Sequence, residues 1–311
     1  MAQYTICAAA DLQSIADEYG LGQLKTTSVL EGGQQNTNYL LDTSSGRFVL
    51  TITEQHSFEE VEKLTSLLRH LQQNDFRTSQ VVPNKAGELV GTWQGKPIML
   101  KAFLEGEVIT DFSASQLYSL GQEIGQLHSL PVPDYMPTAL NYGRENFHQL
   151  DLYAAGSDYQ SWLQEVERYV EPYIAMGLPQ ALIHSDIFDN NVIVNASQDT
   201  VTIMDFEEAA HYYRVFDLGM AFVGVCLERS DINLDKAKHL LRGYQSVIRL
   251  EANERLALKP FLVYAAAAMS FWRHRQFNYT HPTPAKFNHY QALQNVANTA
   301  WALPEDSLLI D

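Results

Sequence analysis

The most informative stretch of this chain is residues 184–191, which read His184-Ser185-Asp186-Ile187-Phe188-Asp189-Asn190-Asn191. Short apolar runs flank this stretch and recur just beyond it, at residues 181–183, 192–194 and 201–204. Runs of this length and composition are typical of buried strands. We therefore expect Asp186 and Asn191 on a loop between two strands and Asp205 just past the end of a third, an arrangement in which the three side chains can converge.

The polar residues of this stretch follow the spacing of a kinase catalytic segment. In that pattern, His-x-Asp-x-x-x-x-Asn followed by Asp-Phe-Gly, the first Asp accepts the proton of the attacking hydroxyl, while the Asn and the second Asp hold a metal ion on the nucleotide phosphates. His184, Asp186, Asn191 and the pair Asp205-Phe206 occupy these positions. A plain turn would explain any one of them, but not the whole set. The sequence thus predicts Asp186 and His184 as catalytic residues and Asn191 and Asp205 as metal ligands.

The residue types suit phosphoryl transfer for a physical reason. The transition state spreads negative charge over the phosphoryl oxygens, so catalysis consists mostly of positioning and of neutralisation by a metal ion. Mg²⁺ is a hard ion that prefers oxygen ligands, which carboxylate and amide groups supply. We therefore expect ATP and Mg²⁺ as cofactors.

The composition limits the kinds of partner. The 311 residues, of which 46% are hydrophobic and 19% charged, are enough for two lobes around sizeable cores. A formal net charge of −16 disfavours nucleic acid and anionic membrane surfaces, and a small hydroxyl compound fits better. Cys7 and Cys226 are expected to be free thiols. The sequence has no signal-peptide pattern and no apolar run of membrane-spanning length, so we expect a cytoplasmic protein, and we leave the oligomeric state open.

The first third of the chain has the pattern of an antiparallel sheet with helices. A helix is expected over residues 10–19, and a second one begins at the capping box formed by Ser57 and Glu60. Strands are expected at residues 25–30, 38–43, 46–54, 88–93 and 97–103. The pattern breaks after these strands. We place the lobe boundary there, between a nucleotide-binding lobe, residues 1–104, and a catalytic and substrate-binding lobe, residues 105–311.

Nucleotide contacts are expected from two parts of the first lobe. The loop that contains Gly32 and Gly33 can lay backbone N–H groups over phosphates, although a plain hairpin turn is the alternative. The backbone near Phe103 would hydrogen-bond the adenine.

The strand at residues 46–54 lacks the lysine that most kinases place there, and Thr51 occupies its position. Arg47, on the same strand face, and Lys101, on a later strand, are both candidates for the missing positive charge. The alternative is that Arg47 is solvated and that Lys101 only extends its head group to water. The sequence does not decide between them.

The second lobe is mostly helical by pattern. Helices are expected at residues 113–128, 158–175, 234–247, 252–276 and 285–301. Asp217 is expected to cap a helix and to support the catalytic loop. Trp272, Arg273 and Arg275 lie in one helix, where the arginines can form a carboxylate-binding fork or, as the alternative, pair with surface Glu and Asp.

Further segments complete a family pattern. They read Gln35-Asn36-Thr37-Asn38-Tyr39-Leu40-Leu41, Gly46-Arg47-Phe48-Val49-Leu50-Thr51, Phe103-Leu104-Glu105-Gly106, and Leu120-Gly121 through Leu127-His128. Together with the catalytic stretch, they make the chain resemble the aminoglycoside phosphotransferase and choline kinase superfamily over nearly its whole length, and within it the bacterial type II homoserine kinases. The resemblance implies an α+β, bilobal protein-kinase-like fold with an N-terminal antiparallel sheet lobe and a larger, mostly helical C-terminal lobe.

The resemblance also implies roles for individual residues. Asp186 would be the catalytic base and Asn191 and Asp205 the Mg²⁺ ligands. ATP would contact Gly32, Gly33, Asn36, Asn38, Thr51 and Phe103. Homoserine would be the favoured hydroxyl substrate, with its carboxylate near Trp272, Arg273 or Arg275 and its ammonium near Asp217 or Glu207.

The chain departs from the family pattern at a few positions. Ser185 stands where Gly is usual, Glu207 and Glu208 follow the Asp-Phe pair, and Gly219 ends a segment that more often ends in Ala. These departures bear on the substrate more than on the chemistry. Choline, an aminosugar or an aminoglycoside is therefore an alternative acceptor, and a nucleotide-binding protein without turnover is an alternative of another class.

Overall fold

The computed structural model describes residues 5–30, 36–196 and 200–310, and its chain divides into two compact units, Met1–Glu105 and Gly106–Asp311. Gly32 and Gly33 lie outside the described residues. Within the described ranges, no helix combines the length and the apolar character that a membrane crossing needs.

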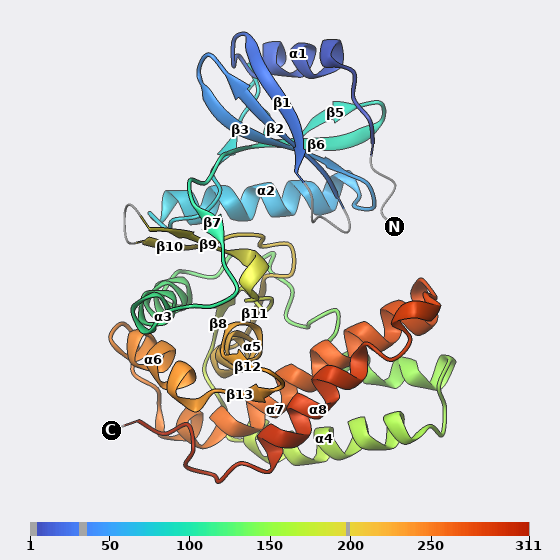
Figure 1. Ribbon diagram of the computed structural model, residues 1–311, viewed down its shortest axis with the longest axis vertical. Coiled ribbons are helices and arrows are strands. Elements are labelled where there is room, and N and C mark those ends of the chain that lie inside the picture. Colours follow the sequence, from blue (N-terminus) through green and yellow to red (C-terminus); the bar gives the residue numbers. More distant parts are fainter. Residues whose placement is uncertain (1–4, 31–35, 197–199, 311) are drawn as a thin grey trace. The chain divides into compact units, whose positions relative to one another are not determined.

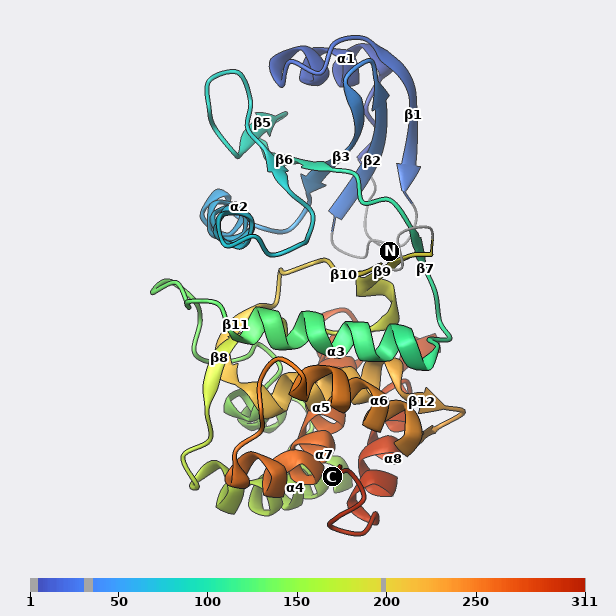
Figure 2. The same cartoon turned by 90° about the vertical axis from the view of Figure 1, so that its left-hand side faces the viewer.

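The first unit is an antiparallel sheet with two long helices. Its elements are α1 (Ala9–Glu18), β1 (Leu24–Leu30), β2 (Asn36–Thr43), β3 (Gly46–Thr53), α2 (Phe58–Gln73), β4 (Val81–Val82), β5 (Gly91–Trp93) and β6 (Lys96–Ala102). The strand order is β1-β2-β3-β6-β4, with β5 also paired to β6. Figures 1 and 2 show α1 and α2 on opposite sides of this sheet.

Side-chain alternation explains how the sheet is covered. Leu50 and Ile52 of β3 point to the side of α1 and pack with Leu12 and Ile15 in one buried cluster. Residues between them on the strand, such as Thr51, therefore belong to the opposite face. Helix α2 begins as expected, because the Ser57 hydroxyl accepts from the Glu60 N–H and the Glu60 carboxylate accepts from the Ser57 N–H at 2.7 Å.

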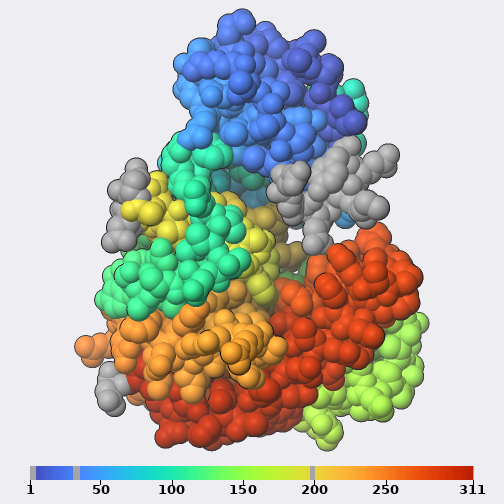
Figure 3. Space-filling model, viewed as in Figure 1, coloured from blue at the N-terminus to red at the C-terminus, as the bar shows by residue number. Residues whose placement is uncertain are grey.

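The second unit is mostly helical. Its helices are α3 (Ala114–His128), α4 (Asp158–Ile174), α5 (Arg214–Val225), α6 (Leu234–Gln245), α7 (Ala252–Arg275) and α8 (Tyr290–Trp301), with short helical turns at Arg144–Leu152 (η1), Asp189–Asn191 (η2), Gln276–Thr280 (η3) and Pro284–Lys286 (η4). Its strands are β7 (Glu107–Val108), β8 (Gln180–Ile183), β9 (Val192–Asn195), β10 (Thr200–Ile203), β11 (Ala210–Tyr213), β12 (Leu227–Glu228) and β13 (Asp231–Ile232). In the space-filling view, α6 and the last helices share one face of this unit (Figure 3).

The structure differs from the expected elements at three points. The last helix begins at Tyr290 and not near residue 285, because Pro284 opens a separate short turn. The strand expected from residue 88 begins only at Gly91. Asp217 is not a helix cap, since Tyr213 occupies that position and Asp217 lies inside α5.

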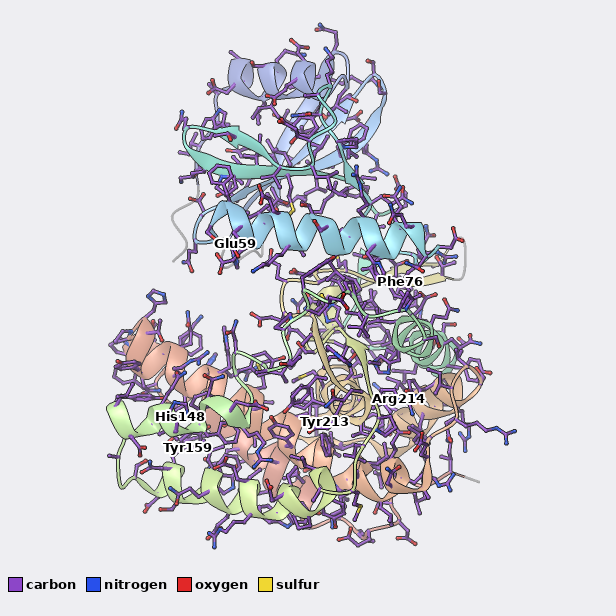
Figure 4. All side chains as sticks on the ribbon, turned by 180° about the vertical axis from the view of Figure 1, so that it is seen from behind. Glu59, Phe76, His148, Tyr159, Tyr213 and Arg214 are labelled. Carbon is purple, nitrogen blue, oxygen red and sulfur yellow. The ribbon has the colours of Figure 1, made fainter. Side chains whose placement is uncertain are left out.

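Close contacts fix α5 in the core of this unit. At its start, Arg214 pairs with the buried Glu254 of α7, with 3.0 Å between Arg214 Nε and Glu254 Oε1. Figure 4 marks Tyr213 and Arg214 at this junction of β11 and α5. Further along, a Cβ added to Gly219 would lie 2.6 Å from the carbonyl oxygen of Phe261, so α5 and α7 touch through their backbones. Helix α5 is thus held on α7, and this matters because it carries Asp217.

His274, near the end of α7, is packed among tyrosines. Its ring stacks on Tyr159 with 4.3 Å between centroids, meets the edge of Tyr290, and lies 3.2 Å from the Tyr153 hydroxyl. Burial lowers the pKa of His274 from 6.5 to about 4. Figure 4 labels Tyr159 and also His148, an exposed histidine of η1.

The lowered pKa of His274 predicts how stability depends on pH. As the pH falls, the unfolded chain protonates His274 near 6.5, before the folded chain does, so the stabilisation is complete above pH 6.5 and is lost progressively toward pH 4. Between pH 7.5 and 5.5 the loss should be about 1 kcal/mol. Urea unfolding should show that His274→Phe removes this share of the pH dependence and that His148→Phe does not. Equal pH profiles for wild type and His274→Phe would contradict the assignment.

Candidate active site

The predicted catalytic loop is held between two strands. It leaves β8, whose partner is β11, passes through Asp186, and enters β9, whose partner is β10. Ser185 and Asp205 both adopt a positive φ, of 66° and 69°, a conformation that residues other than glycine rarely adopt. Ser185 directly precedes the predicted base, and Asp205 is itself a predicted metal ligand.

The Asp217 carboxylate anchors the start of the loop. It is completely buried, and its Oδ1 accepts the Ser185 N–H at 2.7 Å while Oδ2 accepts the His184 N–H at 3.0 Å. His128 Nε2, at the end of α3, lies 3.0 Å from the same Oδ2, and His128 Nδ1 lies 3.0 Å from the Tyr244 hydroxyl. Because Nε2 faces a carboxylate, we assign the proton to it, and the Tyr244 hydroxyl then donates to Nδ1.

This environment keeps Asp217 ionised. Burial by itself raises the pKa of the carboxyl group, but the hydrogen bond from His128 and the one from the His184 N–H outweigh it, so the pKa of Asp217 is lowered. With both oxygens occupied and no exposed surface, Asp217 is in no position to receive a substrate ammonium group. The prediction that Asp217 contacts substrate is corrected accordingly, whereas its expected support of the catalytic loop agrees with these contacts.

His184 is likewise occupied on both sides of its ring. Its Nδ1 accepts the Asp186 N–H at 3.1 Å, and its Nε2 donates to the Met204 carbonyl at 2.9 Å. The ring is buried and meets the edge of Phe206. The sequence predicts a catalytic residue here, but the geometry makes His184 a positioning residue that joins the catalytic loop to the residue before Asp205.

Asp186 is the partly exposed carboxylate of this loop. Asn191 Nδ2 donates to Asp186 Oδ2 at 2.9 Å and to the Asp186 carbonyl at 2.8 Å. Burial raises the pKa of Asp186, an effect that His184 and the Asn191 hydrogen bond oppose. One carboxylate oxygen is therefore fixed by Asn191, and the side chain has a defined direction.

Asn191 and Asp205 are brought together by the β9–β10 hairpin. Its register pairs Val192 with Ile203, and the Met204 N–H donates to the Asn191 carbonyl at 2.9 Å. Asp205 is the next residue and is exposed. The Asn191 amide nitrogen donates to Asp186, so the Asn191 amide oxygen points away from Asp186. This oxygen accepts a hydrogen bond from Asn190 Nδ2 at 3.0 Å.

These two residues fit a Mg²⁺ site. They offer one amide oxygen and one carboxylate, and Mg²⁺ is usually held by one or two protein oxygens with water and substrate phosphates completing its shell. Across the described part of the chain, no group of three or more His, Cys, Asp or Glu side chains is arranged as a metal site. A structural metal centre is therefore not found in those residues, while a phosphate-dependent Mg²⁺ site remains compatible with them.

Three of the predicted nucleotide residues, Asn36, Asn38 and Thr51, fall on one face of the sheet. Asn38 of β2 and Thr51 of β3 are register partners, and the buried Thr51 hydroxyl donates to Asn38 Oδ1 at 2.7 Å. Thr51 thus fixes the orientation of the Asn38 amide. Asn36 is buried at the first position of β2.

The two candidates for the missing positive charge differ in their surroundings. Arg47 forms an ion pair with Glu105, and its guanidinium lies 4.4 Å from the centre of the Phe103 ring. Lys101 shares its sheet face with Thr51, because Thr51 pairs with Met99 two positions earlier on β6. Arg47 is therefore already bound to Glu105 and Phe103. Lys101 is the better candidate for the missing positive charge.

The predicted substrate residues at the end of α7 also differ. Arg275 donates to the Asn141 carbonyl at 2.8 Å and to Gln149 Oε1 at 3.1 Å, and it lies over the Phe271 ring. Arg273 is half-buried, and burial lowers its pKa. Among the ion pairs that join described residues, none includes Arg273. Trp272 and Glu207 are both half-buried.

Two supporting residues carry no site signal in the sequence. By sequence, His128 is the last residue of the helix expected at residues 113–128, and Tyr142, whose hydroxyl donates to the Ser185 carbonyl at 2.6 Å, lies outside every expected element. The available signal was weak. A histidine at a helix end and a tyrosine in a loop both have commoner explanations, and only the fold brings them to the catalytic loop.

Comparison with known proteins identifies the class. The model of the phosphotransferase enzyme family matches residues 26–250, which is more than half of the chain, so the chain belongs to this family. Its members act on hydroxyl groups of small molecules, and the prediction of a small-molecule kinase is confirmed at this level.

Among its relatives, the chain is 30% identical over 279 residues to a homoserine kinase of Rhodopseudomonas palustris, covering 86% of this chain and 84% of the relative. It is 29% identical over 298 residues to a homoserine kinase of Paramagnetospirillum magneticum, covering 91% and 90%. Its fold is similar to that of a microcompartment-associated aminopropanol kinase, with a TM-score of 0.72, 18% identity and coverage of 96% and 99%. An amicoumacin kinase solved with AMP-PNP and Ca²⁺ is similar too, with a TM-score of 0.73, 17% identity and coverage of 96% and 97%. The expected protein-kinase-like fold is thereby confirmed.

The contacts of Asp217 predict a strong effect of a small change. Asp217→Asn places an amide NH₂ where a buried oxygen accepted backbone N–H groups, and it should lower the free energy of unfolding by about 3 kcal/mol. Turnover should fall as well, because His184 and Ser185 lose their anchor. Asp111→Asn is the matched control, since Asp111 forms an exposed pair with Lys236 and should change stability by less than about 0.5 kcal/mol. Similar urea midpoints for the two variants would contradict this account of Asp217.

Proposed function

We propose that this protein transfers the γ-phosphate of ATP to the hydroxyl of homoserine, with Mg²⁺ as the metal ion. The observation that carries the chemistry is the Asp186 carboxylate, partly exposed and held by Asn191 at 2.9 Å in a loop that Asp217 anchors. The support for the acceptor comes from relatives named homoserine kinase at 25 to 30% identity over most of the chain.

In the proposed mechanism, Asp186 receives the proton of the substrate hydroxyl as the hydroxyl oxygen attacks the γ-phosphorus. Its backbone is fixed by His184, and its carboxylate by Asn191. Asn191 and Asp205 would hold Mg²⁺, which neutralises charge on the phosphates when bound. Catalysis would then come from position and charge, as phosphoryl transfer requires.

The nucleotide would contact the first unit. The loop that includes Gly32 and Gly33 would cover the phosphates, with Asn36 and Asn38 at its exit. The backbone near Phe103 would contact the adenine. Thr51 is uncharged, so Lys101 would supply the positive charge that most kinases place at the position of Thr51. Thr51 would act through the Asn38 amide, which its hydroxyl orients.

The acceptor would be recognised by opposite charges at its two ends. Arg273 is the better receptor for the carboxylate, because Arg275 already binds Asn141 and Gln149 and lies on Phe271. The half-buried guanidinium of Arg273 has lost part of its water shell and, in the part of the chain that the structure describes, has no carboxylate in an ion pair with it. A substrate carboxylate that accepts two hydrogen bonds from it would therefore be bound favourably. Glu207, which lies close enough to raise the pKa of Asp186, is the candidate for the ammonium group, and Trp272 would complete the contact surface.

Asp186→Asn should abolish transfer and leave ATP affinity nearly unchanged, because Asp186 acts on the hydroxyl and not on the nucleotide. Asp189→Asn is the matched control in the same loop, since its amide oxygen can still accept the Asn190 N–H, a bond of 2.9 Å in the wild type. Turnover and nucleotide affinity should be measured side by side. Near-normal turnover of Asp186→Asn would show that Asp186 is not the base.

An acceptor panel of homoserine, choline, an aminosugar and an aminoglycoside tests the substrate, and homoserine should have the highest kcat/KM. Arg273→Ala should raise the KM for homoserine by about tenfold or more and leave the KM for choline, which has no carboxylate, unchanged. Arg255→Ala, an exposed arginine of the same helix, is the control. If choline or an aminoglycoside wins, homoserine is the wrong acceptor; if nothing is phosphorylated while ATP still binds, the non-catalytic alternative holds.

A further inference from the structure

Ser185 is a buried residue in which every polar group is used. Its N–H donates to Asp217 Oδ1 at 2.7 Å, its carbonyl accepts the Tyr142 hydroxyl at 2.6 Å, and its own hydroxyl donates to the Glu208 carbonyl at 2.6 Å. It has no exposed surface. The residue directly before the proposed base thus connects three separate segments of the second unit.

The bond to Glu208 closes a turn that contains Asp205. At the start of this turn, His184 Nε2 holds the Met204 carbonyl at 2.9 Å, and at its end the Ser185 hydroxyl holds the Glu208 carbonyl. The adjacent side chains of His184 and Ser185 therefore form hydrogen bonds with the two ends of the segment 204–208. Asp205 lies between them with a φ of 69°.

The conformation of Ser185 makes this bond notable. Its φ of 66° lies in the left-handed region, where a glycine would avoid the strain that a Cβ creates. At this φ a serine is strained relative to a glycine, but its side chain can form a hydrogen bond. The hydroxyl bond to Glu208 is the interaction that glycine would lack.

We propose that the Ser185 hydroxyl is a positioning group that fixes the Asp205 turn relative to Asp186. The inference rests on the proposed function for its effect on turnover and on Mg²⁺, but the contact itself does not. Asp217 holds the backbone of His184 and Ser185, and these residues use their side chains to hold the turn. The relative position of the proposed base and the proposed metal ligand is thereby set within one short network.

A pair of substitutions separates positioning from stability. Ser185→Gly removes the hydroxyl and also relieves the backbone strain, so its melting temperature should stay close to wild type or rise. Ser185→Ala removes the hydroxyl and keeps the strain, so it should be less stable. Both should reduce kcat by about tenfold and raise the Mg²⁺ concentration for half-maximal rate, since both lose the same hydrogen bond. Gln94→Gly, which relieves a positive φ of 49° in the β5–β6 turn, should change neither kinetic quantity.

Hydrogen exchange tests the contact without any ligand. Peptides that cover residues 204–209 should exchange faster in Ser185→Gly and Ser185→Ala than in wild type and Gln94→Gly. Unchanged exchange, or wild-type kcat and Mg²⁺ dependence in Ser185→Gly, would overturn the inference. Wild-type protein that phosphorylates no acceptor would overturn the proposed function instead, and the exchange result would still decide the role of Ser185.

Discussion

The buried carboxylate of Asp217 is the interaction on which the catalytic loop depends. It accepts the backbone N–H groups of His184 and Ser185 at 3.0 and 2.7 Å, and His128 holds it from the other side. A carboxylate without exposed surface is tolerated only if its oxygens are satisfied, so the loop and the charge stabilise each other. Helix α5 carries this group, and the backbone of α5 touches the loop again at Gly224, where an added Cβ would lie 1.9 Å from the Ile187 carbonyl oxygen.

Side chains of the catalytic loop itself connect Asp217 to the rest of the site. His184 and Ser185, whose N–H groups are held by Asp217, use their side chains to hold the Met204 and Glu208 carbonyls. Asn191 then fixes the direction of Asp186, and the β9–β10 register sets Asp205 beside Asn191. A chain of short contacts thus connects a buried helix to the groups that we propose for chemistry, and such pre-organisation is what phosphoryl transfer requires.

Elements and motifs with a periodic pattern or a fixed spacing could be predicted from the sequence. Features that depend on tertiary contacts could not. The sheet, most helices, the Ser57 capping box and the loop with Asp186 and Asn191 were predictable because apolar alternation, cap residues and spacing are local. The link from His128 to Asp217 and the bond from His184 to the Met204 carbonyl were not, because these partners lie 89 and 20 residues apart in sequence. The two arginines looked equivalent for the same reason, until the contacts of Arg275 distinguished them.

Transfer of a phosphoryl group from ATP to the hydroxyl of homoserine can be followed by ³¹P NMR of a mixture of the protein, ATP, Mg²⁺ and homoserine. A phosphomonoester resonance should grow as the γ-phosphate resonance of ATP declines, and chelation of Mg²⁺ should stop both changes. Transfer to homoserine would be contradicted if ATP persisted unchanged, or if its γ-phosphate appeared only as inorganic phosphate with homoserine present.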